Sequence, residues 1–189
     1  MGTDGKVALV LLAAGQSRRF GADKLRAPLG DSDVLTATME SGEYASFDAR
    51  YIVVPSKELV IERPVRWQSV VNREAESGMA SSIRAGVRAA SGHERIVIAL
   101  ADMPFVSAQH LDQLGNAGGV IFTRQQDGRP GSPAAFPRHA FSRLLQLHGD
   151  RGAAALDWPY AALMDPDDGW ELKDIDEPAD LVAANRRPR

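Results

Sequence analysis

The residues that most clearly suggest chemistry follow a short apolar run, Val7 to Ala14, near the start of the chain. This run leads into two glycines and three basic residues: Gly15, Arg18, Arg19, Gly21 and Lys24. A glycine-rich turn lets backbone N–H groups approach an anion, and guanidinium and ammonium groups add opposing charge. The pattern predicts a site for a triphosphate or pyrophosphate where the first strand ends. The alternative is an ordinary surface loop with solvated charges.

Two well-known phosphate loops do not fit this segment. A Walker loop needs four residues between its glycines and then Gly-Lys, but five residues separate Gly15 from Gly21, and Ala22 follows. The dinucleotide fingerprint G-x-G-x-x-G is missing because Gln16 and Ser17 follow Gly15. The mismatch argues against an oxidoreductase that binds nicotinamide or flavin.

Asp102 is the first candidate metal ligand, because it directly follows the apolar run from Arg95 to Ala101. Ligands of open α/β sheets bind at the carboxyl ends of strands. A carboxylate placed there is unfavourable unless it is paired, hydrogen-bonded or bound to a metal. The alternative is an aspartate that caps the turn beginning at Met103.

A second group of carboxylates lies near the end of the chain. In an extended segment, Asp174 and Asp176 would project to the same side. Magnesium binds nucleotides through one or two carboxylates together with phosphate oxygens and water, so we expect Asp102 and Asp174 to be its ligands. Asp176 and Asp180 fit equally well as charges at the start of a final helix. The pattern does not separate Asp174 from Asp176.

Strands and helices are expected to alternate along the whole chain. The expected strands are Val7–Ala14, Tyr51–Val54, Val70–Val71, Arg95–Ala101, Val120–Thr123 and Trp170–Ile175. The expected helices are 35–42, one from Gly78, Ser107–Leu114, 138–147, 152–158 and one from Pro178, with irregular segments at 28–30, 56–66 and 124–132. This alternation predicts a three-layer α/β fold with a mostly parallel sheet. We expect a single domain over residues 1–189, since no linker or repeat divides the chain.

Composition restricts the possible functions. The chain has 189 residues, 44% hydrophobic and 25% charged, which is typical of a globular protein. A net charge of −3 argues against a broad nucleic-acid or membrane surface. The absence of cysteine excludes disulfides, thiolate ligands and a cysteine nucleophile, and the four histidines show no metal-binding spacing. We expect a cytoplasmic protein without a secretory signal or membrane span.

The loop at residues 12–24, L-A-A-G-Q-S-R-R-F-G-A-D-K, resembles the signature of nucleotidyltransferases of the molybdenum-cofactor type, in particular the molybdenum cofactor cytidylyltransferases. Further motifs of that family follow in the same order, G-M-A-S-S-I-R-A-G at 78–86, A-D-M-P-F-V at 101–106 and D-I-D-E-P-A-D-L at 174–181. The resemblance implies a Rossmann-like fold of the nucleotide-diphospho-sugar transferase type.

The resemblance also implies roles for individual residues. Arg19 would neutralise the β- and γ-phosphates, Lys24 would reach the α-phosphate, and Asp102 would hold Mg²⁺. The implied nucleotide contacts are Leu12, Ala13, Ala14, Gly15, Ser17, Arg18, Lys24, Asn72, Gly78, Met79 and Ser82. Ser81 is expected to serve the helix instead. L-A-A-G is typical of the cytidylyl branch, whereas the guanylyl branch tends to have L-A-G-G, so the implied nucleotide is CTP.

The acceptor side matches the family less closely. G-R-P-G-S-P-A-A-F at 128–136 and L-H-G-D-R-G-A at 147–153 resemble the pterin-binding segments, which implies acceptor contacts at Gly131, Ser132, Pro133 and Asp150. Ser132 stands where histidine is common, and Ala154 where arginine is common. Because arginine is a natural partner for an acceptor phosphate, either Arg129 or Arg151 takes its place or the acceptor differs from that of the family.

These features together predict a Mg²⁺-dependent enzyme that transfers CMP from CTP to a phosphorylated acceptor, molybdopterin or the molybdenum cofactor, and releases pyrophosphate. A molybdoenzyme or its chaperone would be the protein partner. The alternatives are the same chemistry with GTP or another nucleotide or acceptor, and a non-catalytic nucleotide sensor or cofactor chaperone.

Overall fold

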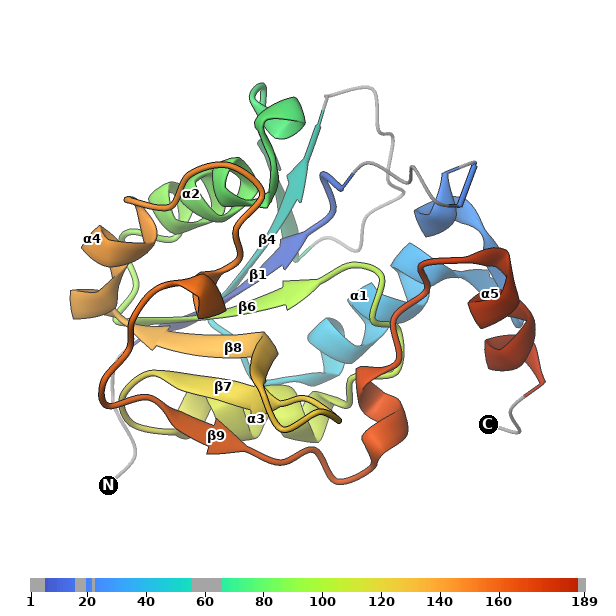
Figure 1. Ribbon diagram of the computed structural model, residues 1–189. Helices are drawn as coiled ribbons and strands as arrows, with labels where there is room; N and C mark the ends of the chain where they lie inside the picture. Colours follow the sequence, from blue (N-terminus) through green and yellow to red (C-terminus); the bar gives the residue numbers. More distant parts are fainter. Residues whose placement is uncertain (1–5, 16–19, 22, 56–65, 187–189) are drawn as a thin grey trace.

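A computed structural model of the protein describes residues 6–15, 20–21, 23–55 and 66–186. Its described part contains a seven-stranded sheet with the strand order β5-β4-β1-β6-β8-β7-β9 (Figure 1). The strands are β1 (Val7–Leu12), β4 (Ala49–Val54), β5 (Trp67–Val71), β6 (Arg95–Leu100), β7 (Ile121–Arg124), β8 (Pro130–Pro137) and β9 (Ala162–Met164). A separate hairpin joins β2 (Pro28–Leu29) to β3 (Ser32–Asp33).

The helices follow the strands in alternation over most of the chain. The α-helices are α1 (Val34–Tyr44), α2 (Met79–Ala89), α3 (Ala108–Asn116), α4 (Phe141–Leu144) and α5 (Pro178–Asn185). Short 3₁₀ helices are η1 (Lys24–Arg26), η2 (Ala75–Ser77), η3 (Arg138–Ala140), η4 (Ala153–Ala155) and η5 (Gly169–Leu172). Local caps define several helix starts as expected, since the Ser107 side chain accepts a hydrogen bond from the His110 N–H at the beginning of α3.

The sheet is mostly parallel, and this confirms the predicted fold class. β1 pairs in parallel with β4 and β6, β4 with β5, and β7 with β9. β8 is antiparallel to both β6 and β7. The carboxyl ends of β1 and β6, which carry the glycine-rich loop and Asp102, are therefore neighbours at one edge of the sheet.

Helices cover both faces of the sheet, so the molecule has three layers (Figure 1). Leu9 and Leu11 point to the side covered by α1 and α3, while Val10 points to the side covered by α2 and α4. This alternation explains why β1 reads as a continuous apolar run. Gly86 lets α2 lie directly on β1, because a Cβ at this position would collide with Val10 Cγ1.

The C-terminal third differs most from the sequence-based expectations. The strand expected at 170–175 is wrong, because residues 169–172 form η5, whose start is capped by the Asp168 carboxylate accepting from the Trp170 N–H at 2.9 Å. The helix expected at 152–158 is only the 3₁₀ turn η4, and the one at 138–147 is the shorter pair η3 and α4.

Two strands in this region were not expected. β8 begins within the segment predicted to be irregular, residues 124–132, and its prolines and glycine conceal the usual strand pattern. Pairing with β6 and β7 makes it a strand, and Ala134, Ala135 and Phe136 are all buried because the sheet is covered on both faces. The short segment β9 likewise forms a strand because it pairs with β7.

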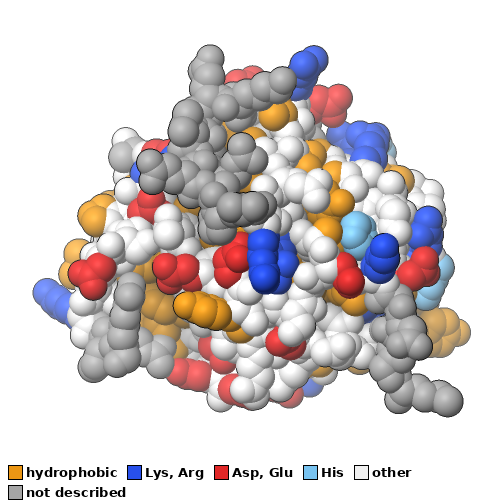
Figure 2. Space-filling model, turned by 180° about the vertical axis from the view of Figure 1, so that it is seen from behind, with side chains coloured by type: hydrophobic (Ala, Val, Ile, Leu, Met, Phe, Trp, Pro, Cys, Tyr) orange, Lys and Arg blue, Asp and Glu red, His pale blue; other side chains and the backbone are white. Residues whose placement is uncertain are grey.

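The face opposite the view of Figure 1 carries basic and acidic side chains interspersed, with hydrophobic side chains in small separate groups (Figure 2). Such a surface is ordinary for a globular domain. None of the helices in the described ranges has the length and apolar character needed to cross a membrane.

Candidate active site

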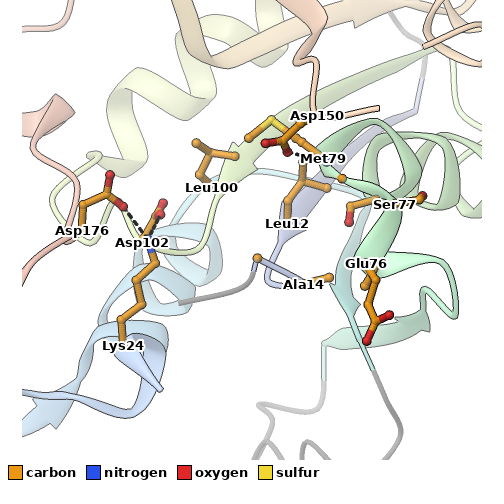
Figure 3. A pocket seen from close by; sticks show the side chains of 14 residues that line it. Leu12, Ala14, Lys24, Glu76, Ser77, Met79, Leu100, Asp102, Asp150 and Asp176 are labelled. Carbon is orange, nitrogen blue, oxygen red and sulfur yellow. Dashed lines mark hydrogen bonds and ion pairs between the residues drawn. The ribbon is translucent and has the colours of Figure 1, made fainter. Parts of the chain in front are cut away.

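An ion-pair cluster lies where β6 ends. Lys24 Nζ donates to Asp102 Oδ2 at 2.6 Å and to Asp176 Oδ1 at 2.7 Å (Figure 3). Lys24 is the first residue of η1. The second residue of this turn, Leu25, is buried in the core and holds the backbone in place. The Ile175 N–H donates to the Asp102 carbonyl oxygen at 2.9 Å and so ties the C-terminal segment to the end of β6. Three segments distant in sequence therefore meet at one lysine.

The cluster holds more negative than positive charge. Burial alone would lower the pKa of Lys24, but the carboxylates of Asp102 and Asp176 outweigh it and raise this pKa, so the side chain is an ammonium at neutral pH. Partial burial of its carboxyl group, and then the charges of Asp176 and Asp102, raise the pKa of Asp174. The charges of Asp102, Asp174 and Asp176 therefore act on one another, and the ammonium group of Lys173 partly offsets their effect on Asp174.

The cluster has the features needed to hold a divalent cation. Asp102 Oδ1 is buried and makes no hydrogen bond to any described residue, so this oxygen has lone pairs available for a ligand. Within the described ranges, no group of three or more His, Asp or Glu side chains could hold a metal ion by itself. Magnesium on a nucleotide needs only one or two carboxylates, because phosphate oxygens and water supply the other ligands. Asp102 with Asp176 or Asp174 matches that requirement.

A cavity of about 560 Å³ extends from this cluster to the start of α2 (Figure 3). The expected nucleotide-binding residues that line it are Leu12, Ala14, Gly15, Lys24, Gly78, Met79 and Ser82. Ala13 and Asn72 are buried outside its lining. Ser17, Arg18 and Arg19 lie outside the described residues, so their roles stay predictions. Most of the described residues chosen from sequence are therefore brought together around one cavity.

The loop at residues 149–150, which was predicted to contact the acceptor, caps the start of α2. The Met79 N–H donates to Asp150 Oδ1 at 3.2 Å, and the Ala80 N–H donates to the Gly149 carbonyl at 3.1 Å. The backbone N–H groups of Met79 and Ala80 are therefore already hydrogen-bonded at this helix start. Asp150 lines the nucleotide-sized cavity, which no local pattern indicated.

Asn72 organises the serine face of α2. Its side chain is buried, and Nδ2 donates to Ser81 Oγ at 2.7 Å and to Ser82 Oγ at 3.0 Å. Ser81 Oγ in turn donates to the Gly78 carbonyl at 2.8 Å, so Ser81 serves the helix start. Asn72 thereby orients the Ser82 hydroxyl, which is on the cavity wall, and direct contact of Asn72 with a ligand stays a prediction.

A second cavity of about 230 Å³ adjoins the first, since Leu12, Met79 and Leu100 line both. Its lining includes the predicted acceptor residues Gly131 and Ser132, together with Ala154 and Asp174. Pro133 does not line it, although the adjoining Ser132 does. The described residues that line this cavity include no lysine or arginine. Because Ala154 replaces the arginine that is common in the family, the wall of the cavity supplies no positive charge.

A buried histidine supports the segment that carries Ser132. His110 is fully buried, and its Nε2 lies 2.8 Å from Thr123 Oγ1, which donates its own hydrogen to the Pro133 carbonyl at 2.7 Å. Because the Thr123 hydrogen is used, the hydroxyl accepts from His110, whose Nε2 must carry a proton. The sequence pattern indicated no role for His110, because its burial depends on the packing of α3 against the sheet.

The buried state of His110 predicts a pH-dependent stability. Burial lowers its pKa below 6.5, against the opposing charges of Glu171 and Asp167, so the unfolded chain takes up a proton more readily than the folded one. The free energy of unfolding should therefore fall as pH drops below about 6.5. Urea unfolding between about pH 5 and pH 7.5 should show this slope, and His110→Gln should reduce it.

The matched control for this measurement is His139→Gln, at an exposed histidine. This variant should keep the wild-type slope. Equal slopes for wild type and His110→Gln would contradict the assignment of the effect to His110.

A side chain introduced at Gly15 is expected to affect ligand binding without affecting the thermal stability of the protein. A Cβ at this position would meet no described atom within 4 Å, and Gly15 lines the larger cavity. Gly15→Val should therefore leave the melting temperature nearly unchanged but weaken the binding of a nucleoside triphosphate at least about tenfold, because the side chain would enter the ligand space. Thermal melting and calorimetric titration measure the two effects, and unchanged affinity would contradict the proposed phosphate approach at this glycine.

A glycine after β1, a carboxylate after β6 and a cavity at the carboxyl ends of parallel strands are the features with which open α/β folds bind nucleotides. Residues 9–161 match the family described as the MobA-like NTP transferase domain. The chain belongs to this family and is a nucleotidyltransferase, as the sequence motifs predicted.

Similar proteins support the same assignment. The chain is 31% identical over 194 residues to the purine catabolism protein PucB of Bacillus subtilis (strain 168), which covers 94% of this chain and 95% of PucB. The crystal structure of Rv0371c from Mycobacterium tuberculosis H37Rv superposes with a TM-score of 0.80 at 26% identity, over 98% of this chain and 100% of that one. A second structure of Rv0371c is a complex with manganese, with a TM-score of 0.71 at 25% identity over 95% and 97% of the chains.

The fold is shared more widely than the sequence. Molybdopterin-guanine dinucleotide biosynthesis protein A from Archaeoglobus fulgidus superposes with a TM-score of 0.71 at 18% identity, over 94% of this chain and 96% of that protein. The expected nucleotide-diphospho-sugar transferase type of fold is thus confirmed.

Proposed function

We propose that this chain is a single nucleotidyltransferase domain that transfers CMP from CTP to a phosphorylated pterin-type acceptor, with Mg²⁺, in the biosynthesis of a molybdenum cofactor. The observation that carries the proposal is the Lys24–Asp102–Asp176 cluster at one end of a nucleotide-sized cavity. The L-A-A-G sequence at residues 12–15 favours cytidine through its resemblance to the cytidylyl branch.

In this reaction an oxygen of the acceptor phosphate attacks the α-phosphorus of CTP, the new P–O bond forms, and the bond to pyrophosphate breaks. The acceptor phosphate is already ionised, so no general base is needed. Lys24 would stabilise charge on the α-phosphate, and Asp102 with Asp176 or Asp174 would hold the metal. A bound divalent cation would neutralise charge on the phosphates and the leaving pyrophosphate. The remaining contribution of the protein is to position the two substrates and exclude water.

Two similar proteins support the metal and the pathway. The manganese complex of Rv0371c supports a divalent cation, and Mg²⁺ is our choice for this chain because it is the usual partner of nucleotide phosphates. The name of PucB places that protein in purine catabolism, so a molybdoenzyme of purine breakdown, or its chaperone, is the partner we propose for the product.

The nucleotide can be tested by calorimetric titration with CTP, GTP, ATP and UTP in the presence of Mg²⁺, followed by pyrophosphate release with a molybdopterin-type acceptor. We expect CTP to bind at least about tenfold more tightly than the other three. Tighter binding of GTP would overturn the cytidine assignment, and nucleotide binding without pyrophosphate release from any pair would favour a non-catalytic sensor.

A second candidate is the same transfer to a different acceptor. It is favoured by Ser132 and Ala154, which line the smaller cavity without supplying a positive charge. Ala154→Arg would restore the arginine common in the family, so it should improve use of a molybdopterin-type acceptor if that is the native substrate. A decrease would favour another acceptor, and Ala155→Arg on the exposed neighbouring position is the control.

A further inference from the structure

The arrangement of Lys24 suggests how the metal site is regulated before substrate binds. Its Nζ lies within 2.7 Å of both Asp102 Oδ2 and Asp176 Oδ1. The ammonium group therefore occupies the space between two of the carboxylates that would hold a divalent cation. The pair is well shielded, since the side chains of Lys24 and Asp102 are 13% and 19% exposed.

We infer that Lys24 occupies the metal position in the absence of nucleotide, and that the α-phosphate must draw this side chain away before a divalent cation binds. The inference rests on the proposed function, because it assumes that Asp102 and Asp176 serve the metal. It gives the lysine two successive partners, first the carboxylates and then the phosphate, and it makes the nucleotide a requirement for tight metal binding.

The ammonium and the divalent cation cannot share this position. Like charges at such short distances repel strongly in a partly buried site. Conversely, the carboxylates cannot lose the ammonium without a replacement, because the negative charges of Asp102 and Asp176 would lie close together without the ammonium group that now stands between them. Replacement of the Lys24 ammonium by a divalent cation keeps positive charge beside the carboxylates. Movement of the Lys24 side chain without such a replacement would leave their negative charge uncompensated.

The local structure allows this exchange to occur by side-chain movement only. Asp23 caps η1 through a hydrogen bond to the Leu25 N–H, and the buried Leu25 holds the backbone of this turn in the core. The four rotatable bonds of the lysine side chain can then redirect Nζ while its Cα stays in place. Lys24, Asp102, Gly15 and Ala14 line the same cavity, so a phosphate bound by the loop after β1 shares a space with the ammonium.

The test is Mn²⁺ binding, followed by electron paramagnetic resonance, for wild type, Lys24→Met, Lys24→Arg and Asp102→Asn in the full chain. Without nucleotide, Lys24→Met should bind Mn²⁺ at least about tenfold more tightly than wild type, because the competing charge is gone. Lys24→Arg should stay as weak as wild type, and Asp102→Asn combined with Lys24→Met should abolish the tight binding. Lys24→Gln gives a second neutral side chain if Lys24→Met does not fold, as judged by circular dichroism.

The outcomes separate this inference from the function on which it rests. Equal, Asp102-dependent binding by wild type and Lys24→Met would overturn the competition while the metal site stands. Absence of any Asp102-dependent Mn²⁺ binding, with or without α,β-methylene CTP, would overturn both the competition and the proposed metal site.

Discussion

Asp102→Asn and Lys24→Met should each lower the rate of pyrophosphate release by about 10²- to 10³-fold, the loss typical of removing one electrostatic group from an active site. Both substitutions nearly preserve the size of the side chain and remove its charge. The effect is expected because Lys24 and Asp102 form one ion pair of 2.6 Å at the end of β6, where phosphate and metal would meet. The measurement is steady-state pyrophosphate release with CTP, Mg²⁺ and a molybdopterin-type acceptor.

Controls for these variants come from exposed charges outside both cavities. Asp165→Asn removes a carboxylate that pairs with Arg124 at 2.7 Å on the surface, and Lys6→Met removes an exposed lysine. Neither should change the rate more than about twofold, since surface pairs contribute little. Near-wild-type release by either active-site variant, with its fold intact by thermal melting, would contradict the assigned roles.

Gly78→Ala adds only one methyl group, but we expect it to lower both the stability of the protein and its affinity for nucleotide. Gly78 has φ 102° and ψ 176°, a region that is essentially restricted to glycine. A Cβ there would also stand 2.6 Å from the carbonyl carbon and oxygen of Gly149. The variant must shift the loop that caps Met79 and Ala80, so both stability and the shape of the nucleotide cavity should suffer. We expect a loss of about 3 kcal/mol in the free energy of unfolding and weak CTP binding.

Urea unfolding and CTP titration measure these two effects. Gly92→Ala is the matched control, because Gly92 has neither a left-handed backbone nor any described atom within 4 Å of the added methyl group. It should be nearly neutral in both measurements. A Gly78→Ala protein as stable as the control, with unchanged CTP affinity, would show that the 149–150 loop does not depend on this glycine.

Local sequence determined the parts of the molecule whose structure depends on near neighbours. The apolar runs of β1 and β6 predict buried strands, and Ser107 predicts the start of α3, because burial on both faces and side-chain capping leave short-range signals. The fold class followed from the alternation of strands and helices. The glycine-rich loop and Asp102 followed from their place directly after the two central strands, where open α/β sheets bind ligands.

Tertiary structure decided which residues meet across long distances in the chain. β8 exists because β6 and β7 pair with it, and its proline-rich sequence carries no such signal. The same holds for the carboxylates, since Asp176 contacts Lys24 while Asp174 lines the smaller cavity, a distinction that their shared spacing could not make. Asp150 likewise reaches the start of α2 only because the close approach at Gly78 brings its loop there. Sequence specifies the chemical groups, and the packing of distant segments selects their partners.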